Sequence, residues 1–102
     1  MSTFVRICAQ SQLPQANQVC EVTAGGRALC VANIDGTIAV LDGTCPHEGG
    51  PLGEGSVEAG KVVCPWHSFA FDAHTGAASD DPDLRVEVFE AKVENGELLA
   101  KL

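Results

Sequence analysis

Short apolar runs separated by glycine-containing turns make up most of the chain. Gly-Gly at 25–26 separates residues 18–23 (QVCEVT) from residues 27–32 (RALCVA), and Asp-Gly at 35–36 separates the latter from residues 37–41 (TIAVL). Two-residue turns of this composition favour tight hairpins, because glycine and aspartate accept the positive φ angles that such turns require. The pattern predicts three consecutive antiparallel strands.

The C-terminal part of the chain continues this pattern. Residues 85–88 (RVEV) alternate polar and apolar as a half-buried strand does, and Asn-Gly at 95–96 joins Val93 to Leu98 and Leu99. No segment has the apolar period of a long amphipathic helix. The expected fold class is all-β.

Length and composition predict one compact domain. The 102 residues are 45% hydrophobic, which suits a single core spanning 1–102. No segment approaches ~20 apolar residues, and the N-terminal stretch has no basic lead followed by an apolar run. We therefore expect neither secretion nor a membrane span, and a cytoplasmic location.

Three of the five cysteines lie in strand-like runs. Cys8, Cys20 and Cys30 have apolar or β-branched neighbours, and we expect them to be buried structural thiols. A disulfide between Cys8 and either Cys20 or Cys30 is the alternative.

The other two cysteines each stand in a short motif, here called a hook. Cys-Pro-His occupies 45–47, Cys-Pro-Trp-His occupies 64–67, and sixteen residues separate them. Thiolate and imidazole donors suit zinc or iron with sulfide better than magnesium or calcium. Cys2His2 zinc fingers place both cysteines in one hook, whereas one cysteine and one histidine in each hook suits a cluster with two cysteines on one iron and two histidines on the other. The hooks predict a metal centre, with zinc as the alternative to iron and sulfide.

This spacing resembles the motif of Rieske [2Fe–2S] proteins. The flanking residues 49–52 (GGPL) and 71–72 (FD) are also similar to that family. The resemblance runs over about 42–82 at motif level and more loosely over the whole chain. It implies a Rieske fold of stacked antiparallel sheets, with an inserted cluster-binding subdomain whose loops span about 43–82.

The resemblance also implies a ligand set. One [2Fe–2S] cluster per chain would be held by Cys45 and Cys64 on the inner iron and by His47 and His67 on the outer iron. 

Several residues near the hooks have expected positions. By the same resemblance, Pro82, in the acidic segment 80–83, would shield the cluster. Trp66 is expected at the site, either over the cluster or exposed in a docking patch. His74 is expected to face solvent in the turn at 73–76, rather than to hold a mononuclear iron.

The residues missing from the hooks indicate a low reduction potential. High-potential members, in quinol-oxidising complexes, have a disulfide between the hooks and two hydroxyls that donate to the cluster. This chain has Gly50, Trp66, Phe69 and Phe71 at those places. Hydrogen bonds to the cluster sulfurs stabilise the reduced state. Because this chain lacks the two hydroxyl donors, we expect a reduction potential near the family's lower end, about −150 mV.

The implied function is electron transfer without catalysis. The chain would be a soluble carrier of one electron from a flavin-dependent reductase to a terminal oxygenase. A small subunit of an assimilatory nitrite reductase is the alternative, and a structural zinc protein is a more distant one. The formal net charge of −8 disfavours nucleic acid and anionic membranes as partners and suits a basic patch on a redox partner.

Overall fold

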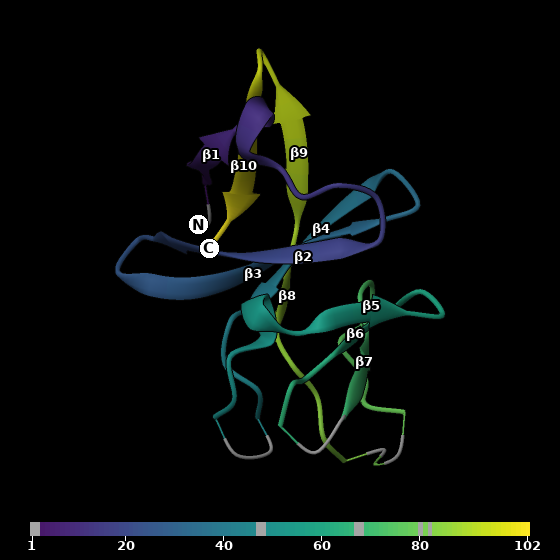
Figure 1. Cartoon of the computed structure of the whole chain (residues 1–102). Coiled ribbons are helices and arrows are strands. Elements are labelled where there is room, and N and C mark those ends of the chain that lie inside the picture. Colours follow the sequence, from purple (N-terminus) through teal and green to yellow (C-terminus); the bar gives the residue numbers. More distant parts are fainter. Residues whose placement is uncertain (1–2, 47–48, 67–68, 80, 82) are drawn as a thin grey trace.

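The computed structural model describes residues 3–46, 49–66, 69–79, 81 and 83–102. Among these residues, ten strands form three antiparallel sheets in the orders β1-β10-β9, β2-β3-β4-β8 and β5-β6-β7, which confirms the all-β fold class (Figure 1). The elements are β1 (Phe4–Ala9), η1 (Gln10–Gln12), β2 (Gln18–Ala24), β3 (Arg27–Ile34), β4 (Thr37–Asp42), η2 (Leu52–Glu54), β5 (Ser56–Glu58), β6 (Lys61–Val63), β7 (Ala70–Asp72), β8 (Val88–Phe89), β9 (Ala91–Glu94) and β10 (Glu97–Lys101). Within the described ranges, no helix is long and apolar enough to cross a membrane.

The predicted hairpins are confirmed. β2 pairs with β3, and β3 with β4, in continuous antiparallel register. Asp35 and Gly36 have φ angles of 52° and 95°, and Asn95 and Gly96, between β9 and β10, have 53° and 77°. Positive φ at both central residues gives a two-residue turn the same twist as the flanking strands. The turn dipeptides alone are therefore enough to predict where these hairpins form.

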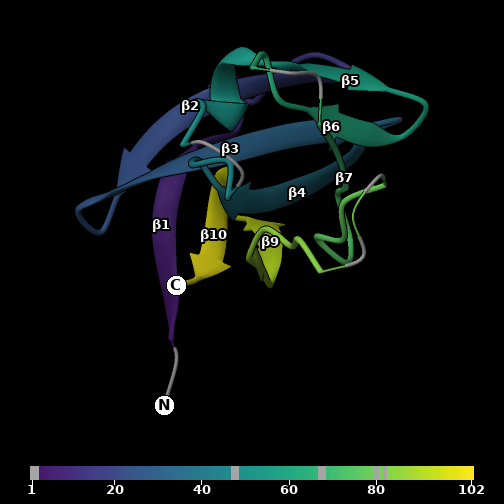
Figure 2. The ribbon, with the colours of Figure 1, turned by 90° about the horizontal axis from the view of Figure 1, so that it is seen from below.

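The middle sheet is buried on both faces. Leu29 and Val31 of β3 pack into the core shared with β1 and β10, whereas Cys30 and Ala32 pack into the core shared with the hooks. Successive side chains of a strand point to opposite faces, and both faces are covered here. All four side chains are therefore fully buried. The β1-β10-β9 sheet crosses the middle sheet steeply on one side, and β5, β6 and β7 lie on the other (Figures 1 and 2).

The strand expected over 85–88 begins three residues later than predicted. β8 starts at Val88. The Val86 N–H donates to the Gly76 carbonyl at 2.9 Å, and the Glu87 carbonyl accepts from Asp42 N–H at 2.9 Å. Through these bonds, residues 85–87 connect the hook-bearing subdomain to the middle sheet. They alternate in burial but do not belong to a continuous strand.

The three cysteines outside the hooks are free thiols, so the alternative of a disulfide is not seen. Cys8 and Cys30 are buried, as expected, whereas Cys20 is only half-buried. Desolvation raises the pKa of all three, and that of Cys30 to about 12. Burial keeps them protonated near neutral pH, as structural thiols are.

Candidate metal centre

The first hook begins where β4 ends, and its base is held by local and long-range hydrogen bonds. The Asp42 Oδ1 accepts the Thr44 N–H at 3.0 Å, and the Gly43 N–H donates to the Ala28 carbonyl of β3 at 3.0 Å. The Leu52 N–H closes the loop by donating to the Gly43 carbonyl at 3.0 Å. The strand that precedes Cys45 is therefore connected directly to the buried middle sheet.

Sequence reasoning missed Arg27 as a support for this base. Its Nη2 lies 3.3 Å from the Asp42 Oδ2 and 3.4 Å from the Glu87 Oε1, and its guanidinium lies 4.8 Å from the Phe89 ring centre. The partners are distant from Arg27 in the chain, so no local pattern could have indicated the contact.

The two hooks are closed by equivalent backbone hydrogen bonds. The N–H of each cysteine donates to the carbonyl five residues later, Cys45 to Gly50 and Cys64 to Phe69, each at 2.8 Å. The two loops lie at the same end of the molecule (Figure 1). The chain thus presents two similar turns, each of which carries one thiol.

The hooks also lie against each other. A methyl group at Gly50 would be 2.8 Å from the Cys64 Sγ and 3.1 Å from the Trp66 Cγ. Glycine is needed here because any side chain would push the second hook away. By the family resemblance, Gly50 and Trp66 stand at the two places where high-potential members have a disulfide.

The two hook thiols lie in an apolar environment. Cys45 is 2% exposed and Cys64 is 1% exposed, and both belong to the core that includes Leu52 and Phe71. The Trp66 backbone N–H donates to the Cys64 Sγ at 3.4 Å. Such a bond stabilises negative charge on sulfur, which a metal-bound thiolate requires.

These features fit an iron–sulfur group. Two buried, soft sulfur donors on facing loops, one of them with an N–H donor, suit iron with sulfide. The other predicted ligands, His47 and His67, lie outside the described residues. The described residues alone contain no group of three or more histidine, cysteine or acidic side chains arranged to hold a metal ion.

The segment that contains Asp80 and Pro82 begins and ends beside the second hook. The Ser79 N–H donates to the Ala70 carbonyl at 2.9 Å, and the Ala78 N–H donates to the Leu84 carbonyl at 3.0 Å. Leu84 packs on the same core as the two hook cysteines. Asp80 and Pro82 lie outside the described residues, so the position of Pro82 over the cluster stays a prediction.

Among the described residues, three aromatic side chains lie beside the hooks. Trp66 is 48% exposed although part of its ring lies beside Gly50. Phe71 is fully buried, and Phe69 is half-buried against the same core. By the family resemblance, Phe69 and Phe71 stand at the two places where high-potential members have hydroxyl donors.

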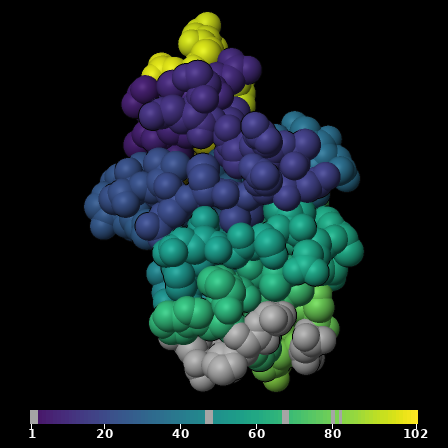
Figure 3. All heavy atoms as spheres, viewed as in Figure 1, coloured from purple at the N-terminus to yellow at the C-terminus, as the bar shows by residue number. Residues whose placement is uncertain are grey.

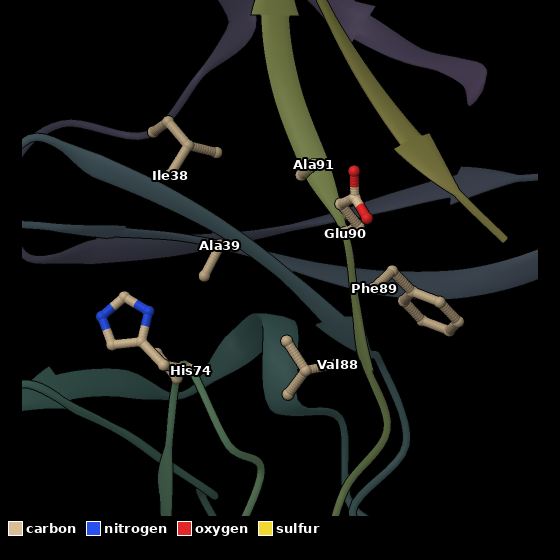
Figure 4. A pocket seen from close by; sticks show the side chains of 8 residues that line it. Ile38, Ala39, His74, Val88, Phe89, Glu90 and Ala91 are labelled. Carbon is tan, nitrogen blue, oxygen red and sulfur yellow. The ribbon is translucent and has the colours of Figure 1, made fainter.

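His74 faces solvent in the turn after β7, as expected. The Asp72 Oδ1 accepts the N–H groups of Thr75 and His74, and these bonds lower the Asp72 pKa. The imidazole lines an open cavity with Glu90, but the two side chains do not converge (Figure 4). The pair offers at most two ligands, fewer than a mononuclear iron site with two histidines and a carboxylate needs.

Comparisons with known proteins agree with this geometry. The chain matches the family model of the Rieske [2Fe-2S] domain over residues 3–92. Apoptosis-inducing factor 3 of Mus musculus is 36% identical over 78 residues, which cover 76% of this chain but 13% of that protein. The chain thus spans only a small part of that relative.

Two other relatives are similar to this chain over most of their own length. Ferredoxin CarAc of Metapseudomonas resinovorans is 30% identical over 97 residues, which cover 93% of this chain and 90% of that protein. A chain from the solved complex of reduced oxygenase and oxidized ferredoxin in carbazole 1,9a-dioxygenase superposes with a TM-score of 0.83 at 28% identity, covering 96% of this chain and 92% of that one. The family match over residues 3–92, with its buried cysteines on facing hooks, shows that the chain belongs to the Rieske [2Fe–2S] domain family, whose cofactor is one [2Fe–2S] cluster per chain.

Proposed function

We propose that this chain is an electron carrier, which takes one electron from a flavin-dependent reductase and delivers it to a terminal oxygenase. The observation that carries the proposal is the pair of facing hooks, which bury Cys45 and Cys64 at one end of the molecule. The oxygenase as acceptor is supported by the relatives of similar length, which are named as ferredoxins or occur in a complex of oxygenase and ferredoxin.

The proposed ligands are the two cysteines and two histidines of the hooks. Cys45 and Cys64 would hold the inner iron, and His47 and His67 the outer one. When bound, the cluster accepts and releases one electron without breaking a substrate bond. Leu52 and Phe71, both fully buried, keep water away from the thiolate side.

The reduction potential should lie near the low end of the Rieske range. Phe69 and Phe71 have no hydroxyl to donate to a cluster sulfur, so the side chains at these places do not stabilise the more negative reduced state. The Trp66 N–H bond to the Cys64 Sγ remains. We expect a midpoint of about −150 mV, and a strongly positive midpoint in a redox titration would contradict this.

Anaerobic purification tests the proposed function. We expect a brown protein with two irons and two acid-labile sulfides per chain, which one electron reduces reversibly. Replacing either His47 or His67 with cysteine should lower the midpoint, because thiolate adds negative charge. A colourless protein with stoichiometric zinc would overturn the proposal, and co-purification with a sirohaem-containing large subunit would instead select the nitrite reductase alternative.

A further inference from the structure

Arg27 contacts side chains from distant parts of the chain. It begins β3, and its Nη2 lies 3.3 Å from the Asp42 Oδ2 at the end of β4 and 3.4 Å from the Glu87 Oε1 just before β8. Its guanidinium also lies 4.8 Å from the ring centre of Phe89, which is buried. These contacts hold the guanidinium in one place, where the middle sheet meets the hook-bearing subdomain.

The Asp42 carboxylate connects Arg27 to the first hook. Its Oδ2 faces Arg27, whereas its Oδ1 accepts the Thr44 N–H at 3.0 Å. Thr44 directly precedes Cys45, one of the proposed ligands. Because a carboxylate is a rigid group, an arginine that fixes one of its oxygens also fixes the other. The guanidinium therefore limits where the Thr44 N–H, and the cysteine after it, can lie.

The backbone next to Asp42 fits closely against the same strand that carries Arg27. A methyl group at Gly43 would lie 2.8 Å from the carbonyl carbon and oxygen of Ala28, and the Gly43 N–H donates to that oxygen at 3.0 Å. Figure 3 shows the blue residues of the middle sheet lying directly against the teal residues of the hook-bearing half. Close-packed contacts resist deformation, so the base of the hook has few alternative positions while Asp42 is held.

We propose that Arg27 is a positioning residue for the [2Fe–2S] cluster, and that it acts through Asp42 on the first hook. By limiting the movement of Cys45, it gives the bound cluster a single environment, and with it a single reduction potential and a narrow spectrum. The inference rests on the proposed electron-carrier function and adds a residue outside both hooks to the groups that determine the properties of the centre.

This role predicts a local effect rather than a large loss of stability. The contact is partly exposed, since 38% of the Arg27 side chain and 31% of the Asp42 side chain are accessible to solvent. Ion pairs of this kind contribute little to the free energy of unfolding. A metal centre, in contrast, responds strongly to the groups that orient its ligands. Loss of Arg27 should therefore change the cluster spectrum more than it changes the thermal midpoint.

The charge of Arg27 offers a different explanation, which two variants separate. Arg27→Gln removes a positive charge, which by itself would lower the reduction midpoint, whereas Asp42→Asn removes a negative charge, which would raise it. Asparagine keeps an oxygen for the Thr44 N–H but presents no carboxylate to Arg27. If both residues act through their mutual contact, the two variants should change the spectrum alike, and the double variant should change it no further.

Electron paramagnetic resonance of the reduced holoprotein and hydrogen exchange of its backbone, followed by mass spectrometry, test the proposal. Glu87→Gln is the matched control for Asp42→Asn, because it also removes a carboxylate partner of Arg27 but leaves the bond from Asp42 to Thr44 in place.

Two further controls cover charge and stability. Arg6→Gln removes the same charge as Arg27→Gln from an arginine that pairs with Glu97 in the outer sheet. Leu98→Ala destabilises the core on the other side of the middle sheet.

We expect Arg27→Gln and Asp42→Asn to broaden the resonance of the reduced cluster. Both should also raise the exchange rate of the segment around Thr44, and the rate at which an iron chelator removes the cluster, by roughly two- to fivefold, as the loss of a partly exposed ion pair implies. The three controls should leave the line shape unchanged.

Midpoints that shift in opposite directions in Arg27→Gln and Asp42→Asn, with unchanged line shapes and exchange rates, would show that charge alone acts. Equal broadening in any control would also overturn the proposal. If Arg27→Gln does not fold, Asp42→Asn against Glu87→Gln still decides, because both remove one negative charge. Wild-type protein without a reducible cluster would overturn the proposed function itself, whereas a reducible cluster whose spectrum no variant changes would overturn only the role of Arg27.

Discussion

Gly76 and Gly96 have almost the same backbone conformation but different surroundings. Their φ angles are 79° and 77°. A methyl group at Gly76 would lie 2.0 Å from the Val86 carbonyl oxygen, whereas one at Gly96 would have no atom within 4 Å. Gly76 also accepts the Val86 N–H, so its neighbour cannot move away without loss of a hydrogen bond. Comparing substitutions at these two glycines therefore separates the free-energy cost of a left-handed backbone from the free-energy cost of a steric contact.

Replacing each glycine with alanine should therefore have unequal effects. Gly96→Ala should cost about 1–2 kcal/mol, the price of a left-handed L-residue, and lower the thermal midpoint by about 4–8 °C per kcal/mol. Gly76→Ala should cost about 3 kcal/mol or more, because the Val86 backbone must also shift. Thermal unfolding followed by circular dichroism measures both. Equal midpoints would mean that the contact relaxes and that φ alone sets the cost.

β3 contributes alternate side chains to both cores. Cys30 lies fully buried on the hook side of this strand. Desolvation, with smaller contributions from nearby Cys20 and Glu21, raises its pKa to about 12. In the unfolded chain its pKa is the ordinary 9.0.

The raised Cys30 pKa predicts a loss of stability at alkaline pH. Below pH 9 the thiol is protonated in both states, so its contribution is fully present. Between pH 9 and about 12 the unfolded chain releases the proton while the folded chain keeps it, so stability falls as pH rises, by up to about 1.4 kcal/mol per unit.

Cys30→Ala tests this dependence. The variant should be less stable at pH 8, because of the cavity it creates, but should lose less further stability between pH 8 and 10.5 than the wild type. Thermal midpoints at the two pH values provide the comparison. The same loss in both proteins would show that Cys30 is not the titrating group.

At the scale of the whole molecule, the middle sheet separates two cores. One core joins it to β1 and β10 and includes Leu98, and the other joins it to the hook-bearing subdomain and includes Leu52, Cys45 and Cys64. Leu52 and Leu98 are both fully buried. A substitution that disturbs the core on the hook side should therefore change the metal centre, whereas one that disturbs the other core should not.

Leu98→Ala and Leu52→Ala form a matched pair for this purpose. Each should cost about 2–5 kcal/mol from the cavity it leaves. Only Leu52→Ala should also alter the visible and electron paramagnetic resonance spectra of the cluster, because Leu52 shares a core with Cys45 and Cys64, the proposed ligands. A changed spectrum in Leu98→Ala would show that the cores are mechanically coupled.

Local signals account for what could be predicted of the fold. The hairpins β2–β3, β3–β4 and β9–β10 follow from dipeptides such as Asp35-Gly36, whose turn chemistry acts within a few residues. The short sheet β5-β6-β7 was expected only as part of a family resemblance. Its three-residue strands are too short to show an alternation, and their pairing depends on packing against the middle sheet.

The sequence by itself determined the chemistry of this protein. Cysteine and histidine at fixed spacing state which donors are present, because donor type is a property of the side chain alone. Tertiary structure decided that Gly50 meets Cys64, that Arg27 supports the first hook, and that the indole of Trp66 stays half-exposed. These are contacts between distant parts of the chain or degrees of burial. They depend on how the sheets pack, and no residue encodes that packing alone.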